Sequence, residues 1–214
     1  MRADRELPDM LTFDTRSAFE RVIAYSVGEE KSAECAARLL DRYGSVATVL
    51  SEGAEEIARV GGFGISTALL VKLIGYVNSR RVTEKFELGR VHDELEIREL
   101  LAAVFLGASV ETVYALLLDA EGRTVALEHI SDGTVNASDI VPRKVLECAK
   151  RRHATSVILA HNHPKGAATA SSDDMVTTGR LAGVFATVGV QLRAHYIVAD
   201  GEIYKIDAEA LFGA

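Results

Sequence analysis

Hydrophobic and polar residues change their spacing part-way along the 214-residue chain. Between residues 15 and 81 apolar side chains recur at helical spacing, which predicts four or five short helices. Asp41-Arg-Tyr-Gly44 ends one of them with glycine at a C-cap position, and Ser45 opens the next. Residues 82–98 are polar and mixed in charge, so we expect a linker that leads into a helix at about 93–105.

The later part of the chain alternates short apolar runs with helical patterns. The runs predict strands at 112–118, 123–130, 155–160, 190–199 and 202–206, and the helical patterns lie at 142–153 and 172–188. Tight turns at Asp119-Ala-Glu-Gly122 and Asp200-Gly201 join neighbouring strands. This order predicts an α+β fold with helices flanking a sheet, in which residues 1–85 form a helical domain and residues 93–214 the mixed domain.

Two histidines stand at the end of the predicted strand 155–160. Side chains alternate along a strand, so His161 and His163 leave it on the same face while Asn162 points away. Histidines in such a position can also be hydrogen-bonded surface residues, and a His-x-His pair alone does not define a metal site. The residues that follow therefore decide between the two interpretations.

A loop of small residues leads from the histidines to Ser171-Ser172-Asp173-Asp174, which has the pattern of a helix start. Asp174 falls in the first helical turn, where its carboxylate can turn back toward the histidines. Two histidines and one carboxylate suit Zn²⁺ and leave its fourth position for water, as in a catalytic site. Ser171-x-x-Asp174 also resembles a capping box, which occurs without any metal, and Asp173 is the main competitor for the third ligand position.

A catalytic zinc site needs an acid or base for the metal-bound water, and Glu111 is the candidate. It precedes the apolar run 112–118 and lies near the metal if that strand neighbours the one ending at His161. Zinc lowers the pKa of its bound water to ~7, so a glutamate can take that proton and deliver it to a leaving amine. Ser171 can then hydrogen-bond the tetrahedral oxyanion. A glutamate before a strand is usually solvated surface, so the assignment depends on the wider pattern.

That wider pattern resembles the JAMM (JAB1/MPN) metallopeptidases, which carry Glu … His-x-His-Pro … Ser-x-x-Asp. Residues 112–206 are similar to the RadC-type branch, whose motif typically reads His-Asn-His-Pro. The resemblance implies a cytidine-deaminase-like α/β/α metal domain. It also implies zinc on His161, His163 and Asp174, with Glu111 as general acid/base and Ser171 as oxyanion stabiliser.

A second pattern lies near the amino terminus. Val60-Gly61-Gly62-Phe63-Gly64-Ile65 separates two helical patterns and resembles a helix-hairpin-helix. In that motif the turn amides and the next helix's N-terminus can face a DNA phosphate, with Lys72 available downstream. The charge balance argues against DNA binding, because residues 1–90 hold 13 Lys and Arg against 14 Asp and Glu, without a basic stripe. A hairpin that only packs the helical domain is the alternative.

The remaining features favour a cytoplasmic protein without a membrane span. No apolar run reaches the ~18 residues needed to cross a bilayer, and the charged first 20 residues exclude a secretory signal. Cys35 and Cys148 are expected to be packing residues. His195, in an apolar strand, is expected to be a satisfied core histidine, with orientation of a ligand as the alternative. The other histidines, His92, His129 and His153, are expected at the surface.

The function predicted from the sequence is a zinc-dependent hydrolase of JAMM type, which cleaves a peptide or isopeptide bond in a peptide or protein substrate. The principal alternative is a DNA-associated protein, linked to DNA repair by the name of the branch, whose metal is structural. A metal-dependent nuclease is the third possibility.

Overall fold

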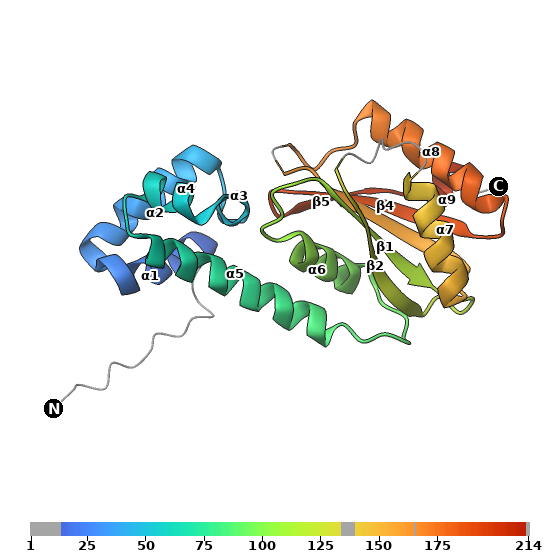
Figure 1. The fold of residues 1–214 in the computed structure, drawn as a ribbon, viewed down its shortest axis with the longest axis horizontal. Helices are drawn as coiled ribbons and strands as arrows, with labels where there is room; N and C mark the ends of the chain where they lie inside the picture. The colour runs from blue at the N-terminus through green and yellow to red at the C-terminus, as the bar shows by residue number, and fades with distance from the viewer. Residues whose placement is uncertain (1–13, 134–139, 165, 213–214) are drawn as a thin grey trace. The chain divides into compact units, whose positions relative to one another are not determined.

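The computed structural model describes residues 14–133, 140–164 and 166–212. The chain divides into two compact units, Met1–Tyr76 and Val77–Ala214, and the boundary falls inside helix α5 (Ile65–Lys85). Residues 1–13 of the predicted helical domain lie outside the described residues. Figure 1 labels the elements of both units.

The described part of the first unit consists of helices. They are α1 (Thr15–Val27), α2 (Glu29–Tyr43), α3 (Val46–Ser51), α4 (Ala54–Gly61) and the first half of α5. Gly44 ends α2 with φ +84°, and the Ser45 side chain caps α3 by accepting a hydrogen bond from the Thr48 amide, as the sequence predicts. The core of this unit is formed by Phe19, Ile23, Leu39, Val49, Ile57 and Val71, all buried.

The turn between α4 and α5 bends the chain by 120°. Gly62 makes this possible because it adopts the left-handed conformation, with φ +70°, and its amide donates to the carbonyl of Ala58. Among the described residues no single helix is long and apolar enough to cross a membrane, and α4 and α5 would pass that test only as a bent pair.

The second unit is built on one five-stranded sheet with the order β2-β1-β3-β4-β5. The strands are β1 (Thr112–Leu118), β2 (Thr124–Asp132), β3 (Ser156–Asn162), β4 (Gln191–Ala199) and β5 (Glu202–Ile206). All neighbours are antiparallel except β3 and β4, which are parallel. The turn between β1 and β2 falls at Asp119–Gly122, where Gly122 has φ +78°.

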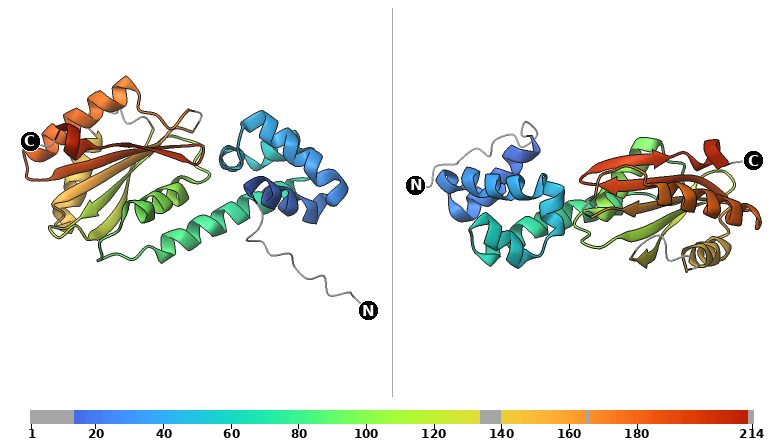
Figure 2. Two further views of the ribbon diagram at one scale, coloured as in Figure 1. Left: turned by 180° about the vertical axis from the view of Figure 1, so that it is seen from behind. Right: turned by 90° about the horizontal axis from the view of Figure 1, so that it is seen from above.

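Helices cover both faces of this sheet (Figures 1 and 2). On one face α6 (Glu94–Phe105) packs Leu100, Leu101 and Phe105 against alternate residues of β1, β3 and β4. The other face carries α7 (Ile140–Arg152), α8 (Ser172–Ala186) and the short α9 (Ala208–Phe212). The second unit is therefore a three-layer α/β/α arrangement, and the predicted α+β fold is confirmed.

The segment between α5 and α6 is shorter and more ordered than the sequence suggested. Helix α5 continues to Lys85, and the following loop joins the start of β2 through the Gly89 amide, which donates to Thr124, and the Thr124 amide, which donates to Arg90. His92 was expected at the surface, but this was wrong: it is buried and stacks on Phe86 with ring centroids 3.8 Å apart. The docking of the loop onto the sheet buries the ring, which the sequence does not indicate.

Candidate metal centre

The two predicted histidine ligands lie at the carboxyl end of β3. This strand runs through Asn162, two residues further than predicted, because it pairs with β1 on one side and β4 on the other. His161 is consequently fully buried. The His163 amide donates to Val198 of β4 at 2.8 Å, so the chain still follows the sheet where the second imidazole emerges.

Helix α8 brings the carboxylate to this point. Ser171 caps the helix, and Asp174 completes a capping box: the Ser171 hydroxyl accepts from the Asp174 amide at 3.1 Å, and Asp174 Oδ2 accepts from the Ser171 amide at 2.8 Å. The serine hydroxyl also donates to Oδ2 at 2.6 Å. The capping box and the ligand role are therefore compatible, because the cap uses Oδ2 and Oδ1 faces His161 at 3.3 Å from Nε2.

Three ligand atoms converge in the way that a tetrahedral cation requires. His161 Nε2 and His163 Nε2 are 2.9 Å apart, and His163 Nε2 is 3.7 Å from Oδ2 of the Asp174 carboxylate. Two nitrogens that each lie ~2.05 Å from a tetrahedral zinc ion are about 3.3 Å apart, within the range of these separations. His161, His163 and Asp174 offer one ligand atom each, all within 4.8 Å of one another, whereas Asp173 is exposed.

The protonation of His163 also fits a metal ligand. Its Nδ1 lies 3.2 Å from the carbonyl oxygen of Ala167, which can only accept, so Nδ1 carries the proton and Nε2 of the neutral ring keeps its lone pair. Gly166 permits this loop to pass close by, since a Cβ there would lie 3.0 Å from His163 Cβ. The Nε2 lone pair of His163 and the Asp174 carboxylate thus form a cluster of acceptors, which suits Zn²⁺.

The electrostatics favour a charged carboxylate in this centre. Burial by itself raises the pKa of Asp174, but the neighbouring His161 and the hydrogen bonds from Ser171 outweigh it and hold the pKa of this carboxyl well below its ordinary value. Burial lowers the pKa of the neighbouring His195 to about 3, with a further contribution from His161. Asp174 is therefore an anion and His195 a neutral imidazole at neutral pH.

Glu111 directly precedes β1, and β1 pairs with β3. The strand after Glu111 therefore neighbours the strand that ends at the histidines, as the proposed role of Glu111 requires. Val113 pairs with His161 at the end of the antiparallel ladder between β1 and β3. Glu111 lies two residues before Val113, and His163 lies two residues after His161, so both follow directly on from this pair. Glu111, which is partly buried, thus lies in the chain next to the pair that joins β1 to the histidine strand.

Asn162 holds the segment that carries Glu111. Its Oδ1 accepts from the Thr112 amide at 2.8 Å, and its Nδ2 donates to the carbonyl of Val110 at 3.1 Å. Asn162 thus contacts the backbone on both sides of Glu111 while lying between the two histidine ligands in the chain. Asn162 was expected on the opposite face and without a role, because its partners lie about fifty residues away in the chain.

Two further residues complete the surroundings of His161. His195 Nε2 lies 2.8 Å from His161 Nδ1, and His195 Nδ1 lies 2.7 Å from Thr178 Oγ1. His195 is a satisfied buried histidine, as expected, and it also contacts a ligand directly. Thr178 was missed, although its position one helical turn after Asp174 is a signal that could have found it.

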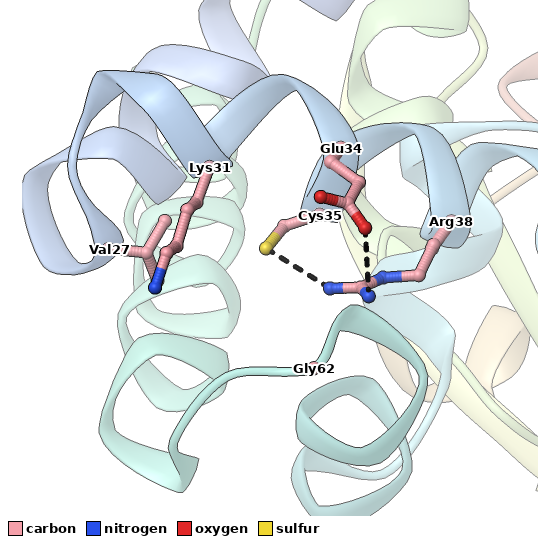
Figure 3. A pocket seen from close by; sticks show the side chains of 6 residues that line it. All are labelled: Val27, Lys31, Glu34, Cys35, Arg38 and Gly62. Atoms are coloured by element: carbon pink, nitrogen blue, oxygen red, sulfur yellow. Dashed lines mark hydrogen bonds and ion pairs between the residues drawn. The ribbon is translucent and has the colours of Figure 1, made fainter.

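The first unit contains a cleft of about 430 Å³ next to the α4–α5 turn (Figure 3). It is lined by Val27, Lys31, Glu34, Cys35, Arg38 and Gly62. The Arg38 guanidinium donates to the carbonyl of Gly61 at 2.6 Å and so holds the turn itself. Lys72 was expected to be available for a phosphate, but its ammonium donates to the carbonyls of Leu50 and Glu52 at 2.7 and 2.6 Å. Both cations therefore support the helical fold.

The fold and the cluster of His161, His163 and Asp174 are typical of a domain of the JAB/MPN class. Residues 91–211, more than half of the chain, match the family described as "RadC-like JAB domain". The chain therefore belongs to the RadC-like JAB family.

Three relatives align with this chain over about two thirds or more of their own length. A "UPF0758 protein" of Desulforudis audaxviator is 34% identical over 212 residues, which cover 90% of this chain and 92% of the relative. "UPF0758 protein BAV2405" of Bordetella avium is 35% identical over 169 residues, covering 78% and 74%. A "UPF0758 protein" of Finegoldia magna is 35% identical over 150 residues, covering 69% and 67%.

Proposed function

We propose that this protein is a zinc-dependent hydrolase of JAMM type that cleaves a peptide or isopeptide bond. The observation that carries the proposal is the convergence of His161 Nε2, His163 Nε2 and Asp174 Oδ1 beside the segment that holds Glu111. Three protein ligands leave a coordination position for a reactant, which distinguishes a catalytic from a structural zinc site. Membership of the JAB family supports the same class of chemistry.

Each residue then has a distinct part in the reaction. A zinc ion, when bound, would acidify a water molecule and polarise the carbonyl that it attacks. The Glu111 carboxylate would take the proton of that water and pass it to the departing amine. Asn162 would keep Glu111 at a fixed distance from the ligands through its bonds to Val110 and Thr112. The Ser171 hydroxyl would donate to the oxyanion once it releases Asp174 Oδ2.

Elemental analysis of the tag-free protein tests the ligand set. We expect about one zinc per chain in the wild type, close to none in His163→Ala, and the wild-type amount in Glu111→Gln, because the glutamate is a base and not a ligand. His129→Ala is the matched control, since that histidine is exposed on β2, where its Nε2 lies 2.9 Å from Asp132 Oδ1. A wild type that neither contains zinc nor takes it up on titration would overturn the proposal.

Cleavage assays separate the hydrolase from the alternatives. With peptide and isopeptide libraries, Glu111→Gln should abolish turnover while zinc stays bound. A structural metal predicts that chelation unfolds the second unit and that Glu111→Gln changes nothing. Cleavage of DNA in place of peptide would instead support the nuclease, and binding to DNA that weakens steeply with salt would support a DNA-associated protein.

A further inference from the structure

A chain of hydrogen bonds leads from the first ligand into the core of the second unit. It runs from His161 Nδ1 to His195 Nε2 at 2.8 Å, from His195 Nδ1 to Thr178 Oγ1 at 2.7 Å, and from Thr178 Oγ1 to the carbonyl oxygen of Asp174 at 2.6 Å. The side chains of His161, His195 and Thr178 are all fully buried. Water therefore does not compete for these groups, and their protons have to be arranged within the chain.

The donor and acceptor of every hydrogen bond in this chain follow from its last acceptor, the carbonyl oxygen of Asp174. A carbonyl oxygen only accepts, so the Thr178 hydroxyl donates its single proton to the carbonyl oxygen of Asp174. The same hydroxyl must then accept from His195, which places the His195 proton on Nδ1. A fully buried imidazole favours its neutral form, so Nε2 of His195 is an acceptor and takes a proton from His161 Nδ1.

We infer that Thr178 and His195 are positioning residues that hold the proton of His161 on Nδ1 and so keep Nε2 free to bind the metal. The inference rests on the proposed function, because it concerns a ligand of the same site. Without the chain, the opposite arrangement is favoured: the Asp174 carboxylate, 3.3 Å from His161 Nε2, attracts a proton onto that nitrogen and blocks it as a ligand. Thr178 and His195 hold the proton on Nδ1 against the attraction of the carboxylate, and they do so without touching the metal.

Substitutions of Thr178 separate this role from simple packing. Thr178→Val keeps the volume and removes the hydroxyl, whereas Thr178→Ser keeps the hydroxyl and leaves a gap. We expect Thr178→Val to bind Zn²⁺ about 10- to 100-fold more weakly in a competition assay with a chromophoric chelator, in line with the loss of groups that orient a ligand. Thr178→Ser should stay close to the wild type. A packing role predicts the opposite order, which would overturn the inference.

Two further variants, both at position 195, test the inference even if Thr178→Val does not fold. In His195→Gln the amide can still accept from His161 and donate to Thr178, whereas His195→Leu can do neither, so glutamine should retain more of the Zn²⁺ affinity. Thr187→Val, at the exposed end of α8, is the control and should bind like the wild type. Equal affinity of the Gln and Leu variants would also contradict the inference.

The protonation itself can be measured in the metal-free wild type. Imidazole ¹⁵N shifts at pH 8.5 should show His161 and His195 both protonated on Nδ1. A proton found on His161 Nε2 would overturn the inference without any variant. This measurement also distinguishes the two proposals: a wild type that takes up no zinc refutes the hydrolase, while the ¹⁵N shifts still decide the role of Thr178 and His195.

Discussion

At the scale of single residues, Asn162 connects the two parts of the candidate site. The residues on either side of it in the chain are the histidine ligands, and its side-chain amide binds the backbone on either side of Glu111. Asn162 and Thr112 are both buried, so no water replaces the Asn162 side chain at the Thr112 amide. A single side chain thus ties the segment of the proposed base to the strand that carries the proposed ligands.

Replacement of this asparagine should cost stability and leave the ligands intact. Asn162→Ala leaves the buried Thr112 amide without its side-chain partner, and a buried group left unpaired costs ~1–3 kcal/mol, whereas the Val110 carbonyl still accepts from Thr112 Oγ1 at 3.3 Å. We expect a lower urea midpoint for the second unit and an unchanged zinc content. Asn78→Ala, an exposed position on α5, serves as the control. An unchanged midpoint for Asn162→Ala would show that the bonds to Val110 and Thr112 contribute nothing net.

The sequence predicts that His161, His163 and Asp174 lie together, as they do in the structure, because the geometry that joins them is local. His161 and His163 share a face through strand alternation, and Asp174 follows eleven residues later in the first turn of a helix. His195 and Thr178 are different, because their contact with each other depends on the parallel pairing of β3 with β4 and on where α8 crosses them. That information is tertiary, and no spacing within one segment carries it.

At the scale of elements, boundaries were predicted best where one residue dictates the backbone. Strand β1 and strand β5 have the predicted bounds, and glycine stands in the turn that follows β1. The end of β3 was placed two residues too early, because the apolar run ends at Ala160, whereas pairing on both sides carries the strand through Asn162. Pairing overrides local preference wherever a strand lies in the middle of a sheet.

The start of α6 makes a prediction about pH. Glu96 accepts from the Arg90 guanidinium and from the Asp93 amide in a capping box, and these bonds lower its pKa from 4.5 to about 2. A carboxyl with a depressed pKa stabilises the fold fully above its unfolded value, and that contribution is lost as the pH falls from about 4.5 toward 2. Glu96→Gln should therefore lower the melting temperature at pH 7, and the difference from the wild type should shrink at pH 3.

Thermal unfolding followed by circular dichroism at both pH values checks this. Glu99→Gln, an exposed position on the same helix, is the matched control and should behave like the wild type throughout. A difference between Glu96→Gln and the wild type that is equally large at pH 3 and pH 7 would mean that the charge of Glu96 is not what stabilises the helix start.

At the scale of the whole molecule, the candidate metal site lies in one of two compact units. All three candidate ligands, Glu111 and the hydrogen-bond chain through His195 belong to residues 77–214, while residues 14–76 form a helical unit with its own core. Helix α5 runs through the boundary between the units without a break. Because the candidate ligands all belong to the second unit, zinc binding should stabilise the two units unequally.

Hydrogen exchange measured with and without zinc tests this asymmetry. A ligand present at 100 times its Kd stabilises the state that binds it by ~2.7 kcal/mol, which slows the most protected amides about 100-fold. We expect that change in β1, β3 and α8, and little change in the core amides of α2. His163→Ala should abolish it. An equal slowing in both units would mean instead that they unfold together, because α5 would then transmit the stabilisation across Tyr76 and Val77 to the helical unit.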